Sequence, residues 1–164
     1  MKNNISSKCK KIKLVITDVD GVLTDGGMYY SPNGDVMKKF FTRDGMGITL
    51  LNKNSIPTMI ITKEKTRMVK QWAKKMSVKK LYDGILDKEL VLEKICKNYN
   101  LKLENIVYIG DDVNDIEILK RVGFSACPSD AISEVKKICD YKCKTKGGNG
   151  VLREVSDLLL KFQK

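Results

Sequence analysis

The sequence predicts an α/β fold in which a largely parallel, doubly wound sheet carries helices on both faces. Short apolar runs alternate with helical patterns along the whole chain, and no internal repeat or low-complexity linker divides its 164 residues. A chain of this length is the size of one domain and can bury a substantial core. We therefore expect residues 1–164 to form a single domain.

Five short runs rich in β-branched and other apolar residues predict the strands of this sheet. They cover residues 12–17, 56–62, 78–82, 106–109 and 122–127. Helical patterns separate them at residues 44–54, 64–76, 87–99 and 113–121. A last helix is expected to begin near Gly150 and end near Lys161. One side of that helix is apolar and consists of Val151, Leu152, Val155, Leu158 and Leu159.

Residues 26–41 predict a β-hairpin flap that follows the first strand. A proline and the pair Asn33 and Gly34 supply strong turn chemistry between two segments with large apolar side chains. Only 37 residues separate Thr24 from Thr62, and they must also hold a helix and a strand. We therefore expect no separate cap domain there or before Lys88. The hairpin could instead cover an edge of its own sheet.

Composition excludes several classes of function. The net charge of +11 would suit a nucleic-acid surface, but the lysines are spread over predicted helices and aromatic residues make up only 7% of the chain. We therefore expect no nucleic-acid partner. The chain has no histidine, and its five cysteines lack paired spacing, so a zinc site of the usual kind and histidine-activated nucleophiles are not expected. Any hydrolytic chemistry must depend mainly on carboxylates.

The N-terminus gives no sign of export. Residues 1–10 are polar and lysine-rich without the apolar core of a signal peptide, and no later run reaches the roughly 20 apolar residues of a membrane span. We therefore expect a cytoplasmic protein with no membrane partner and reduced thiols.

Residues 14–25 contain the most informative pattern, an apolar run that ends in two carboxylates and a glycine turn. Alternation along a strand places Asp18 and Asp20 on the same side of its carboxyl end. In open α/β sheets this end of the strands forms the ligand crevice. The pattern suggests Mg²⁺ and phosphate chemistry, although Asp-x-Asp-Gly alone could be only a polar turn.

A second acidic cluster follows the apolar run at residues 106–109. Gly110 is followed there by Asp111, Asp112 and Asp115. Mg²⁺ takes oxygen ligands, usually one or two carboxylates together with water and substrate phosphate. The two clusters can share an ion only if their strands are neighbours.

Two residues between the clusters fit the needs of phosphoryl transfer. Negative charge spreads over three oxygens of the transferred group, so cations and hydroxyl donors stabilise it. Thr62 follows an apolar strand, and Lys88 follows the segment 84–87. The ordered set of Asp-x-Asp, Thr, Lys and Gly-Asp-Asp-x-x-Asp is much less expected by chance than any of its parts.

In order and spacing, these motifs resemble those of the haloacid dehalogenase (HAD) superfamily of aspartate-nucleophile phosphatases. The similarity extends from about Lys11 to Leu160 and is greatest to a capless branch that includes 3-deoxy-D-manno-octulosonate 8-phosphate phosphatases and nonulosonate (sialic acid, KDN) 9-phosphate phosphatases. Three further segments outside these motifs, residues 24–27, 41–47 and 146–150, also resemble this branch. The resemblance implies a Rossmann-like fold without a cap domain. It also implies Mg²⁺-dependent hydrolysis of a sugar-acid phosphate through an aspartyl-phosphate intermediate, in lipopolysaccharide or sialic acid biosynthesis.

The resemblance also implies roles for the motif residues. Asp18 would be the nucleophile, and Asp20 the general acid and base. Mg²⁺ would be held by the Asp18 carboxylate, the Asp20 main-chain carbonyl and Asp111. The phosphoryl oxygens would be bound by Thr62 and Lys88, while either Asp112 or Asp115 would orient Lys88 or a metal-bound water.

Signals for the substrate are mixed. The segment that begins at Arg43 resembles the octulosonate enzymes, whereas Glu64 with Lys75 resembles the nonulosonate group, and Lys63 departs from both patterns. We take Arg43, Glu64 and Lys75 as further substrate-binding candidates, and the loop after Thr62 favours a nine-carbon substrate.

The resemblance further implies a homotetramer. In that branch the hairpins assemble the tetramer, and a glycine-rich C-terminal segment of one subunit reaches the next subunit's site. Residues 144–164 match this segment through Gly147, Gly148 and Gly150, although an ordinary loop before a helix would look similar. Two other classes of protein remain possible at this point, a phosphoacceptor signalling domain and a non-catalytic oligomerisation module.

Overall fold

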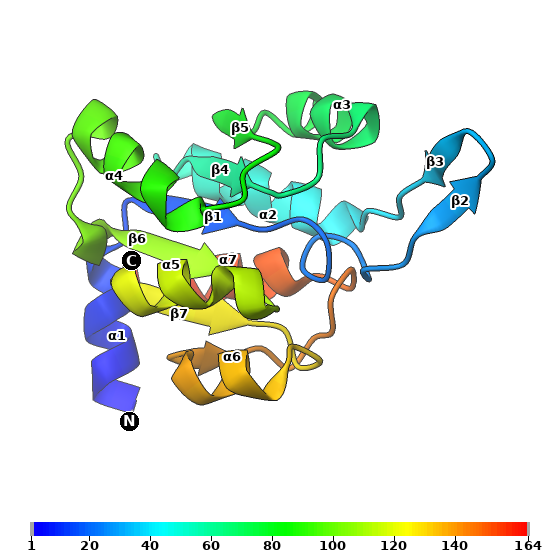
Figure 1. Ribbon diagram of the computed structural model, residues 1–164. Helices are drawn as coiled ribbons and strands as arrows, with labels where there is room; N and C mark the ends of the chain where they lie inside the picture. Colours follow the sequence, from blue (N-terminus) through cyan, green and yellow to red (C-terminus); the bar gives the residue numbers. More distant parts are fainter. Residues whose placement is uncertain (1, 164) are drawn as a thin grey trace.

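A six-stranded parallel sheet forms the centre of the protein (Figure 1). The computed structural model describes residues 2–163, with side chains from Ile5 onward. The strands lie in the order β5-β4-β1-β6-β7-β8. Their bounds are Leu14–Thr17 for β1, Thr58–Ile61 for β4, Lys80–Tyr82 for β5, Ile106–Ile109 for β6, Phe124–Cys127 for β7 and Tyr141–Lys142 for β8.

Helices cover both faces of the sheet, which confirms the predicted doubly wound fold. One face packs against α1, α2, α3 and α7, and the other against α4, α5 and α6. The helices are α1 Lys2–Lys11, α2 Thr42–Lys53, α3 Arg67–Lys75, α4 Lys88–Tyr99, α5 Ile116–Arg121, α6 Ser133–Ile138 and α7 Val151–Gln163. Short 3₁₀ turns, η1 Leu103–Asn105 and η2 Val113–Asp115, precede β6 and α5. None of the helices within residues 2–163 combines the length and apolarity that a membrane span requires.

The central strands are buried on both sides, which explains their continuous apolar sequence. In β1, Val15 packs toward the face covered by α2 and α7, whereas Leu14 and Ile16 pack toward the face covered by α4. All three side chains are fully buried. The strand therefore fixes the position of the loop that follows it.

Three elements were not predicted from the sequence. Helix α1 is mostly polar, and it joins the core through few apolar side chains, of which Cys9 is fully buried. Helix α6 has only six residues, and β8 has two. Asp140 stabilises the edge of the sheet that β8 forms, since its carboxylate accepts a hydrogen bond from the Ser125 amide of β7 at 3.1 Å. Such short or polar elements carry too little periodicity for a sequence pattern to detect.

The hairpin of residues 26–41 projects from the body of the protein as an antiparallel pair, β2 Tyr29–Ser31 and β3 Gly34–Met37 (Figure 1). It forms its own two-stranded sheet and does not pair with the central one. It therefore does not cover an edge of the main sheet, and the described residues contain no cap domain. Large apolar side chains are exposed on it, namely Met28, Tyr29, Tyr30, Val36 and Met37.

The glycine-rich segment before α7 packs against its own chain. The Gly148 amide donates to the Val22 carbonyl at 3.0 Å, and a Cβ at Gly147 would lie 2.2 Å from the Gly21 carbonyl oxygen. These glycines are needed because two backbone segments approach each other closely. Within this chain Gly147 and Gly148 therefore support the loop after β1, and the reach of this segment into a neighbouring subunit's site stays a prediction.

Candidate active site

The order of the strands brings the predicted motifs to one end of the sheet. Strand β1 lies between β4 and β6, so Asp18, Thr62 and Asp111 follow three adjacent strands. The chain runs from β1 outward to β4 and β5, and then to β6, β7 and β8 on the opposite side. This reversal is the topological switch point at which open α/β sheets bind ligands. The two acidic clusters can therefore act on one ligand.

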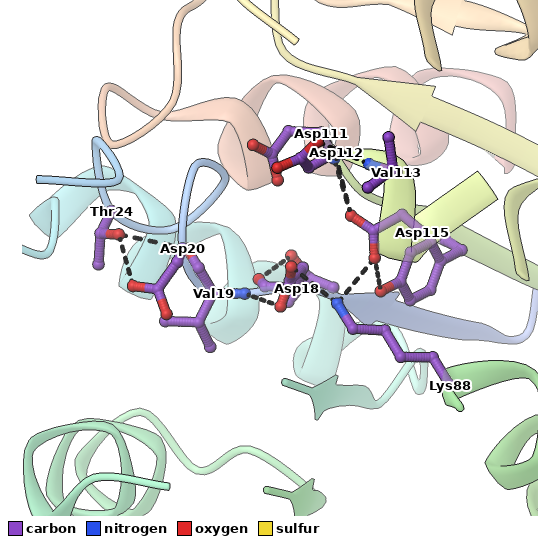
Figure 2. A network of polar contacts seen from close by, with 11 residues as sticks. Asp18, Val19, Asp20, Thr24, Lys88, Asp111, Asp112, Val113 and Asp115 are labelled. Atoms are coloured by element: carbon purple, nitrogen blue, oxygen red, sulfur yellow. Dashed lines mark hydrogen bonds and ion pairs between the residues drawn. The ribbon is translucent and has the colours of Figure 1, made fainter. Parts of the chain in front are cut away.

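Lys88 lies at the centre of a buried ionic network (Figure 2). It is the first residue of α4 and is fully buried. Its Nζ lies 2.8 Å from Asp18 Oδ2 and 2.7 Å from Asp115 Oδ1. Burial would lower the pKa of the ammonium, but the two carboxylates outweigh this effect and raise that pKa. Lys88 is therefore a permanent cation beside Asp18.

Asp115 connects Lys88 to the second acidic cluster. Its Oδ1 also accepts a hydrogen bond from the Tyr108 hydroxyl at 2.6 Å, while Oδ2 accepts from the Asp111 amide at 2.9 Å. Asp112 instead caps the N-terminus of η2, where its Oδ1 accepts a hydrogen bond from the Val113 amide at 2.7 Å. Of the two acids that the sequence left open, Asp115 is thus the one that contacts Lys88.

Asp20 occupies the other side of the site, next to Thr24 (Figure 2). It also has a partner that was not predicted from the sequence, Lys38. Its Oδ1 accepts hydrogen bonds from Lys38 Nζ at 2.5 Å and from the Thr24 hydroxyl at 3.3 Å. Lys38 follows β3 directly, and only 6% of its side chain is exposed. No pattern in the sequence separates it from the exposed Lys39, because the contact depends on the path of the hairpin.

The carboxylates of Asp18, Asp111 and Asp115 form a cluster whose donor atoms lie within 4.8 Å of one another. Burial and the charge of Asp115 raise the pKa of Asp18 to about 7 and the pKa of Asp111 to about 8. Asp111 Oδ1 is buried and has no hydrogen-bond partner among the described residues. Both oxygens of Asp115 and both oxygens of Asp18 already have partners within the chain, so Asp111 Oδ1 is the oxygen of this cluster that is left for a ligand. These observations fit a divalent cation, which would offset the repulsion between the acids.

Glycine at position 21 is required by the same cluster. Gly21 has a φ of +81°, and a Cβ there would lie 2.0 Å from Asp111 Oδ2. Any larger residue would strain the backbone and displace the Asp111 carboxylate. The Asp-x-Asp-Gly pattern is therefore part of the site and not only a polar turn.

A small polar cavity of about 140 Å³ opens between the three strand ends. Thr62 and Glu64 lie there as the sequence predicted, together with Asn114, which the sequence analysis missed. The full lining consists of Asp18, Asp20, Thr62, Lys63, Glu64, Asp111, Asp112 and Asn114.

Two predicted substrate-binding residues lie outside this cavity. Lys75, at the end of α3, lines a separate groove of about 900 Å³ between α2 and α3. The guanidinium of Arg43 lies 5.8 Å from the centre of the Phe41 ring. Neither side chain contributes to the acidic cavity within this chain.

The fold and this site define a hydrolase of the haloacid dehalogenase type. Residues 54–155 match the family model described as haloacid dehalogenase-like hydrolase, and the chain belongs to this family. Among curated proteins, it is 36% identical to the 3-deoxy-D-manno-octulosonate 8-phosphate phosphatase of Haemophilus influenzae over 159 residues, which cover 97% of this chain and 88% of that protein. The corresponding Escherichia coli K12 phosphatase is also 36% identical, over 98% of this chain and 85% of its own.

Solved structures give the same result. The Moraxella catarrhalis 3-deoxy-D-manno-octulosonate 8-phosphate phosphatase, solved with a magnesium ion, a phosphate ion and KDO, matches with a TM-score of 0.96 at 35% identity, over 99% of this chain and 94% of that one. The Yersinia pestis phosphatase matches with a TM-score of 0.95 at 34% identity, covering 98% and 87%. The chain is thus a phosphatase, a phosphoric monoester hydrolase, and not a signalling domain or a non-catalytic module.

Proposed function

We propose that the protein hydrolyses 3-deoxy-D-manno-octulosonate 8-phosphate with Mg²⁺ as cofactor. The observation that carries this proposal is the convergence of Asp18, Asp20, Thr62, Lys88 and Asp111 on one end of the sheet, in a chain whose relatives are named for that reaction. The loop after Thr62 favoured a nine-carbon substrate. Similarity to octulosonate enzymes over nearly the whole chain outweighs that local signal.

The chemistry begins with an attack of the Asp18 carboxylate on phosphorus. The bond between phosphorus and the sugar oxygen breaks, and Asp20 gives its proton to the departing alkoxide. Water then attacks the aspartyl phosphate while Asp20 takes a proton from it. This step restores the free Asp18 carboxylate and releases inorganic phosphate. Asp20 suits this role because its Oδ2 has no hydrogen-bond partner among the described residues.

Mg²⁺ would be held by the Asp18 carboxylate, the Asp20 main-chain carbonyl and Asp111. When bound, it supplies positive charge for the phosphoryl oxygens. Lys88 adds a second cation close to Asp18, and Asp115 keeps its ammonium oriented. Thr62 borders the same cavity, and its hydroxyl would donate a hydrogen bond to a phosphoryl oxygen.

A comparison of two substrates tests the proposal. Phosphate release should be measured with octulosonate 8-phosphate and with a nonulosonate 9-phosphate, each with Mg²⁺ and with a chelator. We expect kcat/KM to be higher for the eight-carbon substrate and activity to disappear with the chelator. A preference for the nine-carbon substrate would instead support the signal of the loop after Thr62.

Replacing Asp111 should weaken metal binding. In Asp111→Ala the site loses one of its few anionic ligands, so we expect half-maximal activity to require at least about tenfold more Mg²⁺. Titration of the rate with Mg²⁺ measures this change. Asp112→Ala is the matched control, because it removes an adjacent charge whose oxygen serves the Val113 amide. Equal Mg²⁺ dependence in the two variants would exclude Asp111 as a ligand.

We further propose that the exposed hairpin mediates a homotetramer. Its apolar side chains cannot be buried within the hairpin, where Met28 and Tyr30 are each 63% exposed. The triple variant Met28→Ser, Tyr30→Ser, Val36→Ser should form smaller particles than the wild type in light scattering. Tyr99→Ser, which removes an exposed aromatic ring at the end of α4, should leave particle size unchanged. A wild-type protein that is monomeric at micromolar concentration would disprove this assembly.

A further inference from the structure

We propose that Lys38 is a positioning residue for Asp20: it holds Oδ1 of the carboxylate and thereby leaves Oδ2 free to exchange the proton with the leaving group. This inference rests on the proposed function, in which Asp20 is the general acid. It concerns a residue of the hairpin, outside the motifs that follow β1, β4 and β6.

The Lys38 side chain that contacts Asp20 is unusually buried for a lysine. Only 6% of the Lys38 side chain and 31% of the Asp20 side chain are exposed. Among the ion pairs of the described residues, those of Lys88 are the only ones in which the lysine is more buried. Removing an ammonium from water is unfavourable unless a close anion compensates. Asp20 is the anion that Lys38 meets, at 2.5 Å.

The two oxygens of Asp20 have different surroundings. Oδ1 accepts from Lys38 and from the Thr24 hydroxyl, whereas Oδ2 is buried with no partner among residues 2–163. Two donors on one oxygen restrict rotation of the carboxylate, and the charge-assisted bond from Lys38 is the stronger one. A buried oxygen without a partner costs free energy unless a ligand supplies one. Because Asp20 lines the cavity beside Asp18, the leaving-group oxygen is the partner that the mechanism provides.

Lys38 also links the position of the hairpin to the position of Asp20, the proposed general acid. It follows β3 directly, so its position depends on how the hairpin leaves the body of the protein. The neighbouring Lys39 is 53% exposed and lies 3.5 Å from Asp25, at the edge of the same loop. Lys38 and Lys39 therefore form a natural pair for comparison, with one buried contact to the proposed acid and one exposed contact to a different carboxylate.

The test uses substrates that differ in how much they need a proton donor. The 4-nitrophenolate of 4-nitrophenyl phosphate leaves without protonation, phenolate is more basic, and a sugar alkoxide is more basic still. The value of kcat/KM reports on steps up to the first irreversible one, so it isolates cleavage from later hydrolysis of the intermediate. In Lys38→Met we expect kcat/KM to be nearly unchanged for 4-nitrophenyl phosphate, lower for phenyl phosphate, and about ten- to one-hundredfold lower for octulosonate 8-phosphate.

Matched variants separate this role from others. Lys39→Met should match the wild type on all three substrates, and Lys38→Arg, which keeps a cation, should retain most of the activity. An equal loss on all three substrates in Lys38→Met would overturn the inference, because misfolding lowers every rate alike. A loss confined to the sugar phosphate, with phenyl phosphate unchanged, would overturn it in favour of a direct contact between Lys38 and the sugar.

Asp20→Asn distinguishes failure of the inference from failure of the proposed function. It should show the same graded loss as Lys38→Met, only larger. If Asp20→Asn shows the graded loss and Lys38→Met does not, the role of Lys38 is rejected and the proposed function stands. If Asp20→Asn lowers all rates equally, Asp20 is not the general acid, and the inference about Lys38 is rejected with it.

Discussion

Asp18→Asn should lose at least about a thousandfold in kcat on octulosonate 8-phosphate, because an amide cannot serve as the nucleophile. The substitution preserves the volume of the side chain. It can also keep the oxygen that accepts the Val19 amide at 2.7 Å. Phosphate release under saturating Mg²⁺ measures the loss. Asp157→Asn, on the exposed side of α7, should retain wild-type activity. An Asp18→Asn enzyme with near-normal turnover would exclude Asp18 as the nucleophile.

For the same variant, Asp18→Asn, we expect the stability relative to the wild type to depend on pH. Burial and the charge of Asp115 raise the pKa of Asp18 from its ordinary value of 3.8 to about 7. Between these values the folded state binds more protons than the unfolded state, so this group's contribution to stability falls as pH rises. In metal-free buffer, urea unfolding should therefore show that Asp18→Asn gains stability relative to the wild type from pH 4 to pH 7. A constant difference over this range would contradict the raised pKa.

The central part of the fold could be predicted because its signals are local. Buried parallel strands are continuous apolar runs, and the polar residues after β1, β4 and β6 mark their carboxyl ends. Alternation along a strand, together with the rule that open α/β sheets bind ligands at the carboxyl ends of their strands, was sufficient to predict a site there. The residues that predict it are Asp18, Asp20, Thr62 and Asp111. Lys88 required more, since only the family motif distinguished it from the other lysines.

The remaining features depend on contacts between distant segments. Lys38 contacts Asp20 from the segment after β3, 18 residues further along the chain. Asp115 faces Lys88 because η2 tightens the chain after Asp112. Lys75 lies at the far end of α3, where it lines a different groove from Glu64, so their spacing in sequence did not predict a shared site. No pattern within one segment encodes such relations.

Lys88→Met should abolish activity and also lower the free energy of unfolding by about 3–5 kcal/mol. The Lys88 ammonium lies within 2.8 Å of two buried carboxylates, and its removal leaves those charges facing each other. Methionine fills a similar volume, so packing changes little. Urea unfolding and phosphate release measure the two effects. Lys94→Met, on the exposed side of the same helix, should change neither.

The stability that Lys88→Met loses should depend on pH, and the direction of this dependence identifies repulsion between the two carboxylates as the cause. Lys88 lowers the pKa of Asp18, so its removal raises that pKa further above 7. Protonation then relieves the repulsion at acidic pH, and we expect the destabilisation of Lys88→Met to be smaller at pH 6 than at pH 8. The double variant Lys88→Met, Asp115→Asn removes one of the two facing charges, so it should recover stability without recovering turnover. A double variant that regained activity would show that Lys88 acts only by balancing charge, and not on the phosphoryl group.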